Sequence, residues 1–308
     1  FVFAVDTQTG EEVWRFETSG QVSRSPSVKN GRVYFGQQGG NEEMYCVDAA
    51  TGQPLWVSKV GWVWTSSTPD DTQVYTGTVD GNIVALRADS GEPVWTFRTN
   101  GGGYPAPAVD DQRVYTGSWD GQCYAIDKKT GALDWAYSSF GGLPDSAAGV
   151  IWKGLFICRT DGELCGLDLN TGEKLWAFRD PREGLGKTVM NATPSNSGDY
   201  TFVSTSIDHD GAALGATLYC IDNTNGEELW HYTVAGGWTG SSSTTNTVIC
   251  GSSTEAFVTC LGVTPNPDGT PRILWRTKIG GILEETIPAI SGNMAYLLCS
   301  DGYLYAFR

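Results

Sequence analysis

Two short segments of the sequence carry residue types that could bind a phosphate group or a metal ion. The segment "EGLGKT", residues 183–188, ends in Gly-Lys-Thr, the part of a phosphate-binding loop that holds a nucleotide. That motif also needs a glycine five residues before Gly186, and the residue there is Pro181. The segment "DHDG", residues 208–211, has two acidic residues and a glycine, but it lacks the third ligand position and the distal glutamate of a calcium loop. We therefore expect loops at both segments and no metal site.

Histidine and cysteine offer little further chemistry. The two histidines, His209 and His231, are too few for a histidine-rich metal site, and the eight cysteines include no CxxC motif, which argues against a zinc ribbon or a thioredoxin-type site. Cys158 and Cys165 flank an Asp-Gly turn in "CRTDGELC", which would place them directly opposite on paired strands with Cα atoms about 5.5 Å apart. That separation allows a disulfide. Two reduced thiols packed between sheets are the alternative.

The charge of the chain limits its partners. It has 20 Lys and Arg against 35 Asp and Glu, a net charge of −15, so a nucleic acid or an anionic membrane surface would be repelled. No apolar run is long enough to cross a membrane as a helix. The sequence opens on "FVFAVD", inside a repeat and without Met. We therefore expect residues upstream of Phe1, including a signal or a membrane anchor.

The residues that could take part in binding or catalysis must be positioned by a repeat that runs through the whole chain. Segments such as "FAVDTQTGEEVWRF" and "LYCIDNTNGEELWHY" recur roughly every 40 residues, a period that suits one four-stranded propeller blade. The spacing is longest before the sixth repeat. The repeated tryptophans are Trp14, Trp56, Trp95, Trp135, Trp176, Trp230 and Trp275.

Each repeat contains the pieces of four short strands. A "P-x-V"-like strand and a "RVYTG"-like strand come first, followed by an Asp-Gly turn that suits a tight hairpin. A third strand leads into a D-x-x-T-G turn, whose side chains can bond backbone amides while its glycine takes a left-handed conformation. The tryptophan strand closes the repeat. Since one blade cannot bury both of its faces, we interpret the tryptophan as a structural residue that packs on the next blade.

This pattern resembles the tryptophan-docking repeat of the PQQ-like β-propellers, a superfamily that includes BamB-type outer-membrane assembly factors, quinoprotein alcohol dehydrogenases and sensor domains. The resemblance covers residues 1–308 and implies a single all-β domain, a β-propeller of four-stranded blades. Departures include Arg87 and Ser90 in one turn and Asn225 in another. Seven tryptophans favour seven blades, and eight blades, the usual number in this superfamily, are the alternative.

The propeller implies a set of residues at one mouth of a central channel. The first strand of each blade begins just after the connection from the preceding tryptophan strand, so polar and aromatic side chains there should converge. They could hold a planar ligand such as a quinone, or they could simply fill and solvate a funnel. These candidates are Arg24, Trp64, Thr65, Tyr104, Asp145, Asn191, Trp238, Ser241, Glu284 and Glu285.

The resemblance implies a function without catalytic residues. We expect a non-catalytic scaffold, similar to BamB-type factors, that presents loops to a protein partner in the periplasm, at the cell envelope or outside the cell, with or without a lipid anchor. A PQQ-dependent dehydrogenase is one alternative, in which PQQ and calcium would be bound. The chain lacks the adjacent cysteine pair and the long insertions typical of those enzymes. A ligand-sensing ectodomain of a larger signalling protein is the other alternative.

Overall fold

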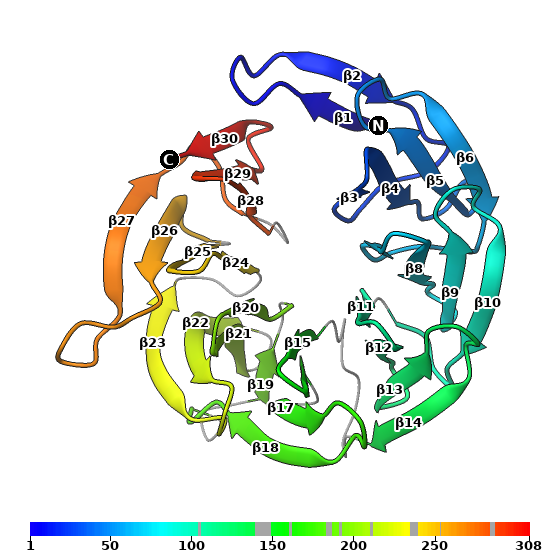
Figure 1. Cartoon of the computed structure of the whole chain (residues 1–308). Coiled ribbons are helices and arrows are strands. Elements are labelled where there is room, and N and C mark those ends of the chain that lie inside the picture. The colour runs from blue at the N-terminus through cyan, green and yellow to red at the C-terminus, as the bar shows by residue number, and fades with distance from the viewer. Residues whose placement is uncertain are drawn as a thin grey trace. The chain divides into compact units, whose positions relative to one another are not determined.

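The protein is described here by a computed structural model (Figure 1), in which the described residues form β-strands, turns and the loops between them. The structure describes residues 1–103, 106–138, 149–159, 162–182, 187–190, 193–209, 212–234, 240–252, 254–283 and 287–308. Within these ranges no helix is long and apolar enough to cross a membrane. The chain divides into two compact units, unit 1 (Phe1–Ala148) and unit 2 (Gly149–Arg308).

Unit 1 contains a two-stranded sheet followed by three four-stranded sheets, each an antiparallel meander in chain order. Its strands are β1 (Val2–Val5), β2 (Glu12–Phe16), β3 (Ser27–Lys29), β4 (Arg32–Gly36), β5 (Glu43–Asp48), β6 (Pro54–Lys59), β7 (Thr68–Pro69), β8 (Gln73–Gly77), β9 (Asn82–Arg87), β10 (Pro93–Arg98), β11 (Ala108–Val109), β12 (Arg113–Gly117), β13 (Gln122–Asp127) and β14 (Leu133–Ser138).

Unit 2 contains sheets of four, five, four and three strands in its described residues. Its strands are β15 (Val150–Trp152), β16 (Leu155–Arg159), β17 (Glu163–Asp168), β18 (Lys174–Arg179), β19 (Lys187–Met190), β20 (Ser195–Ser197), β21 (Tyr200–His209), β22 (Ala212–Asp222), β23 (Glu228–Val234), β24 (Ser241–Ser243), β25 (Thr247–Gly251), β26 (Phe257–Gly262), β27 (Arg272–Lys278), β28 (Ala289–Ser291), β29 (Met294–Leu298) and β30 (Leu304–Phe307).

The prediction of an all-β chain built from four-stranded blades is confirmed. Seven sheets have at least three strands within the described ranges, and these are the seven blades that the tryptophan count favours. The extra length of the fifth blade goes into strand β19, which pairs with a lengthened β21. The sheet of β1 and β2 joins a third-strand sequence to a tryptophan strand and has no inner strands of its own.

In every sheet that contains a repeated tryptophan, the register places a small residue opposite it. Gly166 faces Trp176, and a Cβ atom on this glycine would lie 2.3 Å from the indole ring. The register shifts at or next to these small residues, so each tryptophan strand is locally irregular beside its ring. The small residues are Ala4, Cys46, Ala85, Ala125, Gly166, Cys220 and Cys260.

At least five of these tryptophans donate their indole N–H to a carbonyl oxygen of the following sheet. In unit 1 the acceptors are Ala49 for Trp14 (3.0 Å), Ala88 for Trp56 (3.0 Å) and Lys128 for Trp95 (2.9 Å). In unit 2 they are Asn223 for Trp176 (2.9 Å) and Val263 for Trp230 (2.8 Å). The apolar core lies in the same place, between successive sheets: Tyr34, Met44 and Trp56 pack against Val74 and Leu86.

The D-x-x-T-G turns are built as their sequence predicts. The carboxylate of Asp48 accepts hydrogen bonds from the backbone N–H groups of Ala50 and Thr51 and from the Thr51 hydroxyl. Gly52 then adopts a positive φ of 70°, and a Cβ atom there would lie 2.7 Å from the ring of Trp14. Both the conformation and the close approach of the indole therefore require glycine.

Candidate binding surface

The strands of unit 1 end on two faces that differ in chemistry. We call one the hairpin face, made of hairpins 37–42, 78–81 and 118–121 and of the described parts of connections 17–26, 60–67 and 99–107. The opposite, turn face carries turns 30–31, 70–72 and 110–112 and the D-x-x-T-G turns. The described channel-mouth candidates of this unit, Arg24, Trp64 and Thr65, precede the first strands and belong to the hairpin face.

The structure brings two of the predicted candidates together. The guanidinium carbon of Arg24 lies 5.9 Å from the centre of the Trp64 ring, a cation–π arrangement between two neighbouring connections. Thr65 is buried, and its hydroxyl bonds to the Ser66 carbonyl at 3.3 Å. In unit 2, Ser241 is buried and its hydroxyl lies 3.0 Å from that of Ser195.

The remaining candidates lie outside the described residues, so their placement stays a prediction. They are Tyr104, Asp145, Asn191, Trp238, Glu284 and Glu285. The short first strands beside the described candidates are held by side-chain hydrogen bonds to the next sheet. Ser27 and Ser67 share a hydroxyl hydrogen bond of 2.8 Å, and the Thr68 hydroxyl donates to the Pro107 carbonyl at 2.6 Å.

The sequence analysis missed a shallow depression on the hairpin face of unit 1. It has a volume of about 340 Å³ and is lined by Asp80, Arg98, Thr99, Asn100, Gly101 and Gly102. Beside it stands Trp62, a large side chain with 49% of its surface exposed. Its backbone carbonyl accepts the N–H of Val79, the residue before Asp80. One signal could have found this place, because Trp62 lies outside the regular spacing of the repeated tryptophans.

Hydrogen bonds fix the walls of this depression. The N–H and the hydroxyl of Thr99 both donate to the carbonyl of Gly81 at 2.9 Å. The N–H of Asn100 donates to the carboxylate of Asp120 at 2.9 Å, and the Tyr124 hydroxyl donates to the same carboxylate at 2.6 Å. Burial and this bond to Asp120 raise the pKa of the Tyr124 hydroxyl. The loop that lines the depression is therefore held by its neighbours.

The charges around the depression are satisfied unequally. The Asp80 carboxylate accepts hydrogen bonds from the hydroxyl of Thr78 and from the side-chain amide of Asn82, the latter at 2.8 Å. The side chain of Arg98 is exposed and makes no hydrogen bond or ion pair with any residue that the structure describes. The local acid is thus bonded by neutral donors, and the cation is left open to a ligand.

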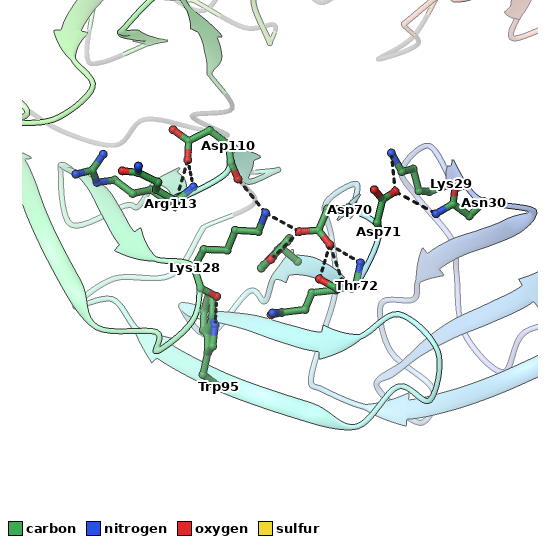
Figure 2. A network of polar contacts seen from close by, with 12 residues as sticks. Lys29, Asn30, Asp70, Asp71, Thr72, Trp95, Asp110, Arg113 and Lys128 are labelled. Carbon is green, nitrogen blue, oxygen red and sulfur yellow. Dashed lines mark hydrogen bonds and ion pairs between the residues drawn. The ribbon is translucent and has the colours of Figure 1, made fainter.

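The turn face carries a dense polar network instead (Figure 2). The ammonium group of Lys128 lies 2.8 Å from the carboxylate of Asp70 and donates to the Asp110 carbonyl at 3.0 Å. Asp70 also accepts hydrogen bonds from Thr72 and from Tyr75. Burial alone raises the pKa of Asp70, but these donors outweigh it and hold the pKa well below its usual range. Each of these groups is bonded to other groups of the protein, so we interpret the network as one that stabilises the fold.

A second buried charge lies in unit 2, where the chain leaves β18. The Asp180 carboxylate is inaccessible to solvent and bonds to the guanidinium of Arg182 (2.6 Å) and to the hydroxyls of Thr205 and Tyr219. Burial raises the pKa of Asp180, but the bonds from Arg182, Thr205 and Tyr219 lower it to about 2. The site anchors the start of the connection that leads to β19.

The cysteines and the acidic residues add no further site among the described residues. Cys158 and Cys165 face each other across β16 and β17 as the turn predicts, and both are buried, reduced thiols in the structure. The Cys165 thiol donates to the Glu163 carboxylate at 3.4 Å. Within the ranges that the structure describes, no three His, Cys, Asp or Glu side chains are grouped so that they could hold a metal ion. The expectation of no bound cofactor stays a prediction.

Comparison with protein families connects this geometry to known proteins. A family model described as outer membrane protein assembly factor BamB matches residues 2–61 and 40–178, together more than half of the chain. BamB of Nitrosomonas eutropha is 32% identical over 96 residues, which are 31% of this chain and 23% of that protein. Quinoprotein alcohol dehydrogenase PedH of Pseudomonas putida is 30% identical over 104 residues, which are 27% of this chain and 16% of that enzyme. The matched stretches therefore span less than a quarter of either relative.

Solved structures extend the likeness to nearly the whole chain. The crystal structure of BamB from Moraxella catarrhalis superposes with a TM-score of 0.75 at 18% identity, covering 96% of this chain and 88% of that one. Quinohemoprotein alcohol dehydrogenase from Comamonas testosteroni superposes with a TM-score of 0.72 at 14% identity, covering 96% and 67%. These likenesses confirm the β-propeller fold. They do not separate scaffolds from enzymes, because both kinds of protein share it.

Proposed function

The chain belongs to the family of the outer membrane protein assembly factor BamB, and on this premise we propose that it is a non-catalytic scaffold that binds a protein partner at the cell envelope. The partner contacts the hairpin face of unit 1. The observation that carries the proposal is Trp62, which is half exposed on this face. Exposed aromatic side chains beside polar groups are typical of the centres of protein interfaces.

The rigidity of the surrounding loops supports the same role. Trp62, Val79, Gly81 and Thr99 are linked by backbone hydrogen bonds across two neighbouring sheets, so the exposed ring stands on a fixed platform. Because little ordering is needed when a partner binds such a surface, the entropic cost of association is lowered.

A site-specific photocrosslinker tests this surface. A benzoylphenylalanine in place of Trp62 should give one discrete protein adduct when the protein is irradiated with the envelope fraction of its own organism. The matched control is the same group in place of Lys129, which is exposed on the turn face and should give no such adduct. Equal adducts at both positions, or none at either, would contradict a specific partner on the hairpin face.

A PQQ-dependent dehydrogenase is the second candidate, and the pair of Arg24 and Trp64 is the observation that favours it. A guanidinium and an indole together could bind a planar, anionic quinone. Incubation with PQQ and calcium, followed by dye-linked alcohol oxidation, tests this candidate. The scaffold role predicts no activity above the no-protein control and no loss on replacing Arg24 with Gln. Turnover that disappears in this variant would favour the enzyme.

A further inference from the structure

We propose that the partner of the hairpin face presents an acidic residue next to an apolar residue, with the carboxylate on Arg98 and the apolar side chain on Trp62. The inference rests on the proposed scaffold function and names the chemistry of the segment that docks there. It concerns the depression lined by Asp80, Arg98 and Asn100.

A backbone contact links Trp62 to the depression that Arg98 lines. The carbonyl of Trp62 accepts the N–H of Val79 at 2.9 Å, and the next residue, Asp80, forms a wall of the depression. Arg98 lines the same depression from the end of β10. A short extended segment that crosses hairpin 78–81 would therefore contact both Trp62 and Arg98.

In unit 2, the arginine at the strand position equivalent to Arg98 is neutralised by a carboxylate of the protein itself. Arg98 and Arg179 both lie three residues after a repeated tryptophan. Arg179 faces Glu163 across the strand pair and forms an ion pair with it. Arg98 faces the neutral Asn82, whose side chain bonds to Asp80 instead. The carboxylate that Glu163 supplies in unit 2 is absent at Arg98, and an acidic residue of the partner would fill the same role.

Hydrogen-bond satisfaction argues against a basic segment. Asp80 is already bonded to the Thr78 hydroxyl and to Asn82, and Asp120 to the N–H of Asn100 and the hydroxyl of Tyr124. A basic segment would have to compete with these donors and approach the guanidinium of Arg98. An acidic segment meets an open cation, and such charge pairs favour one partner over others in an otherwise acidic protein.

Fluorescence anisotropy with two labelled peptides tests the inference in the full chain. The acidic probe is Gly-Glu-Phe-Glu-Gly, and the neutral probe is Gly-Gln-Phe-Gln-Gly. We expect the acidic probe to bind at least about tenfold more tightly, and this preference to shrink as salt rises. Arg98→Gln and Asn82→Glu should both remove the preference, the second by supplying the carboxylate that Arg179 already has. Trp62→Ala should weaken both probes, and Lys129→Gln should change neither.

The outcomes separate this inference from the scaffold role. Equal binding of the two probes, no binding of either, or an unchanged preference in Asn82→Glu would overturn the acidic–apolar chemistry. The photocrosslinking at position 62 is read without any peptide. It can therefore succeed while the inference fails, and its own failure would count against the scaffold role.

Discussion

The ammonium group of Lys128 and the carboxylate of Asp70 lie 2.8 Å apart and join the turn faces of two successive sheets in unit 1. The same lysine contributes its backbone carbonyl to the indole N–H of Trp95. One residue therefore fastens a sheet to its neighbour through both its side chain and its backbone. Both charged groups are largely buried, with 17% and 23% of their side-chain surfaces exposed, so solvent screens this pair less than a surface ion pair.

Replacement of Lys128 by Met should lower the free energy of unfolding by about 1–3 kcal/mol, because the largely buried Asp70 loses its charged partner. The apolar stem and the backbone bond to Trp95 remain. Lys129→Met, on the exposed neighbour in the same turn, is the control and should change stability by less than about 0.5 kcal/mol. Urea midpoints measure both. Equal midpoints for the two variants would show that the Lys128–Asp70 contact has no net effect on stability.

Acid should weaken unit 2 through Asp180. The folded-state pKa of this buried carboxylate is lowered to about 2 by Arg182, Thr205 and Tyr219, against an ordinary value near 4. A lowered folded-state pKa adds stability above the unfolded-state value, and this contribution, on the order of 2 kcal/mol, is lost as pH falls from about 4 toward 2. Urea midpoints at pH 5 and pH 2.5 should differ less in Asp180→Asn than in the native sequence. The carboxyl carbon of Asp180 should also titrate below pH 3 by NMR, and a midpoint near pH 4 would contradict the assignment.

The fold could be predicted from the sequence because the signal was repeated. Trp14, Trp56 and Trp176 recur with the same turn before them, and each pairs with a small residue and with a carbonyl of the next sheet. The long interval before the sixth repeated tryptophan was visible in the sequence, but the extra strand β19 was not. This strand pairs with residues 205–208 of β21, which follow the residues of β21 that pair with β20.

The candidate surface was predicted only in part. Arg24 and Trp64 were both expected near the channel mouth because each lies in the connection before a first strand, but their contact was not predicted. The depression beside Trp62 does not, since its walls come from β10, from connection 99–102 and from hairpin 78–81. Whether an arginine is bonded inside the protein also depends on its cross-strand neighbour. Asn82 and Glu163 occupy the same register position, but only Glu163 forms an ion pair with the arginine opposite it. Periodicity reveals the blade, while the variable residues within it decide the chemistry.

The repeated and the irregular tryptophans should respond differently to truncation. Trp176 is buried and bonded to Asn223, so Trp176→Ala should lower the free energy of unfolding by about 3–5 kcal/mol. Trp62 is half exposed, so Trp62→Ala should cost less than about 1 kcal/mol. Urea denaturation followed by circular dichroism measures both. A large loss of stability in Trp62→Ala would mean that this ring stabilises the fold. Weaker partner binding by this variant could then not be assigned to recognition alone.

The glycine that ends the turn before a tryptophan strand should be required for two separable reasons, backbone conformation and contact with the docked indole. Gly226 has a φ of 76°, and a Cβ atom there would lie 2.6 Å from the ring of Trp176. Gly154 has a φ of 86°, but a Cβ atom there would meet nothing within 4 Å. Gly154→Ala therefore measures the conformational strain alone, about 1–2 kcal/mol. Gly226→Ala adds displacement of the Trp176 ring and should cost at least about 1 kcal/mol more. Tryptophan fluorescence should shift in Gly226→Ala and stay unchanged in Gly154→Ala. Equal losses of stability with unchanged fluorescence in both variants would show that the turn glycine serves the backbone only and that the indole does not depend on it.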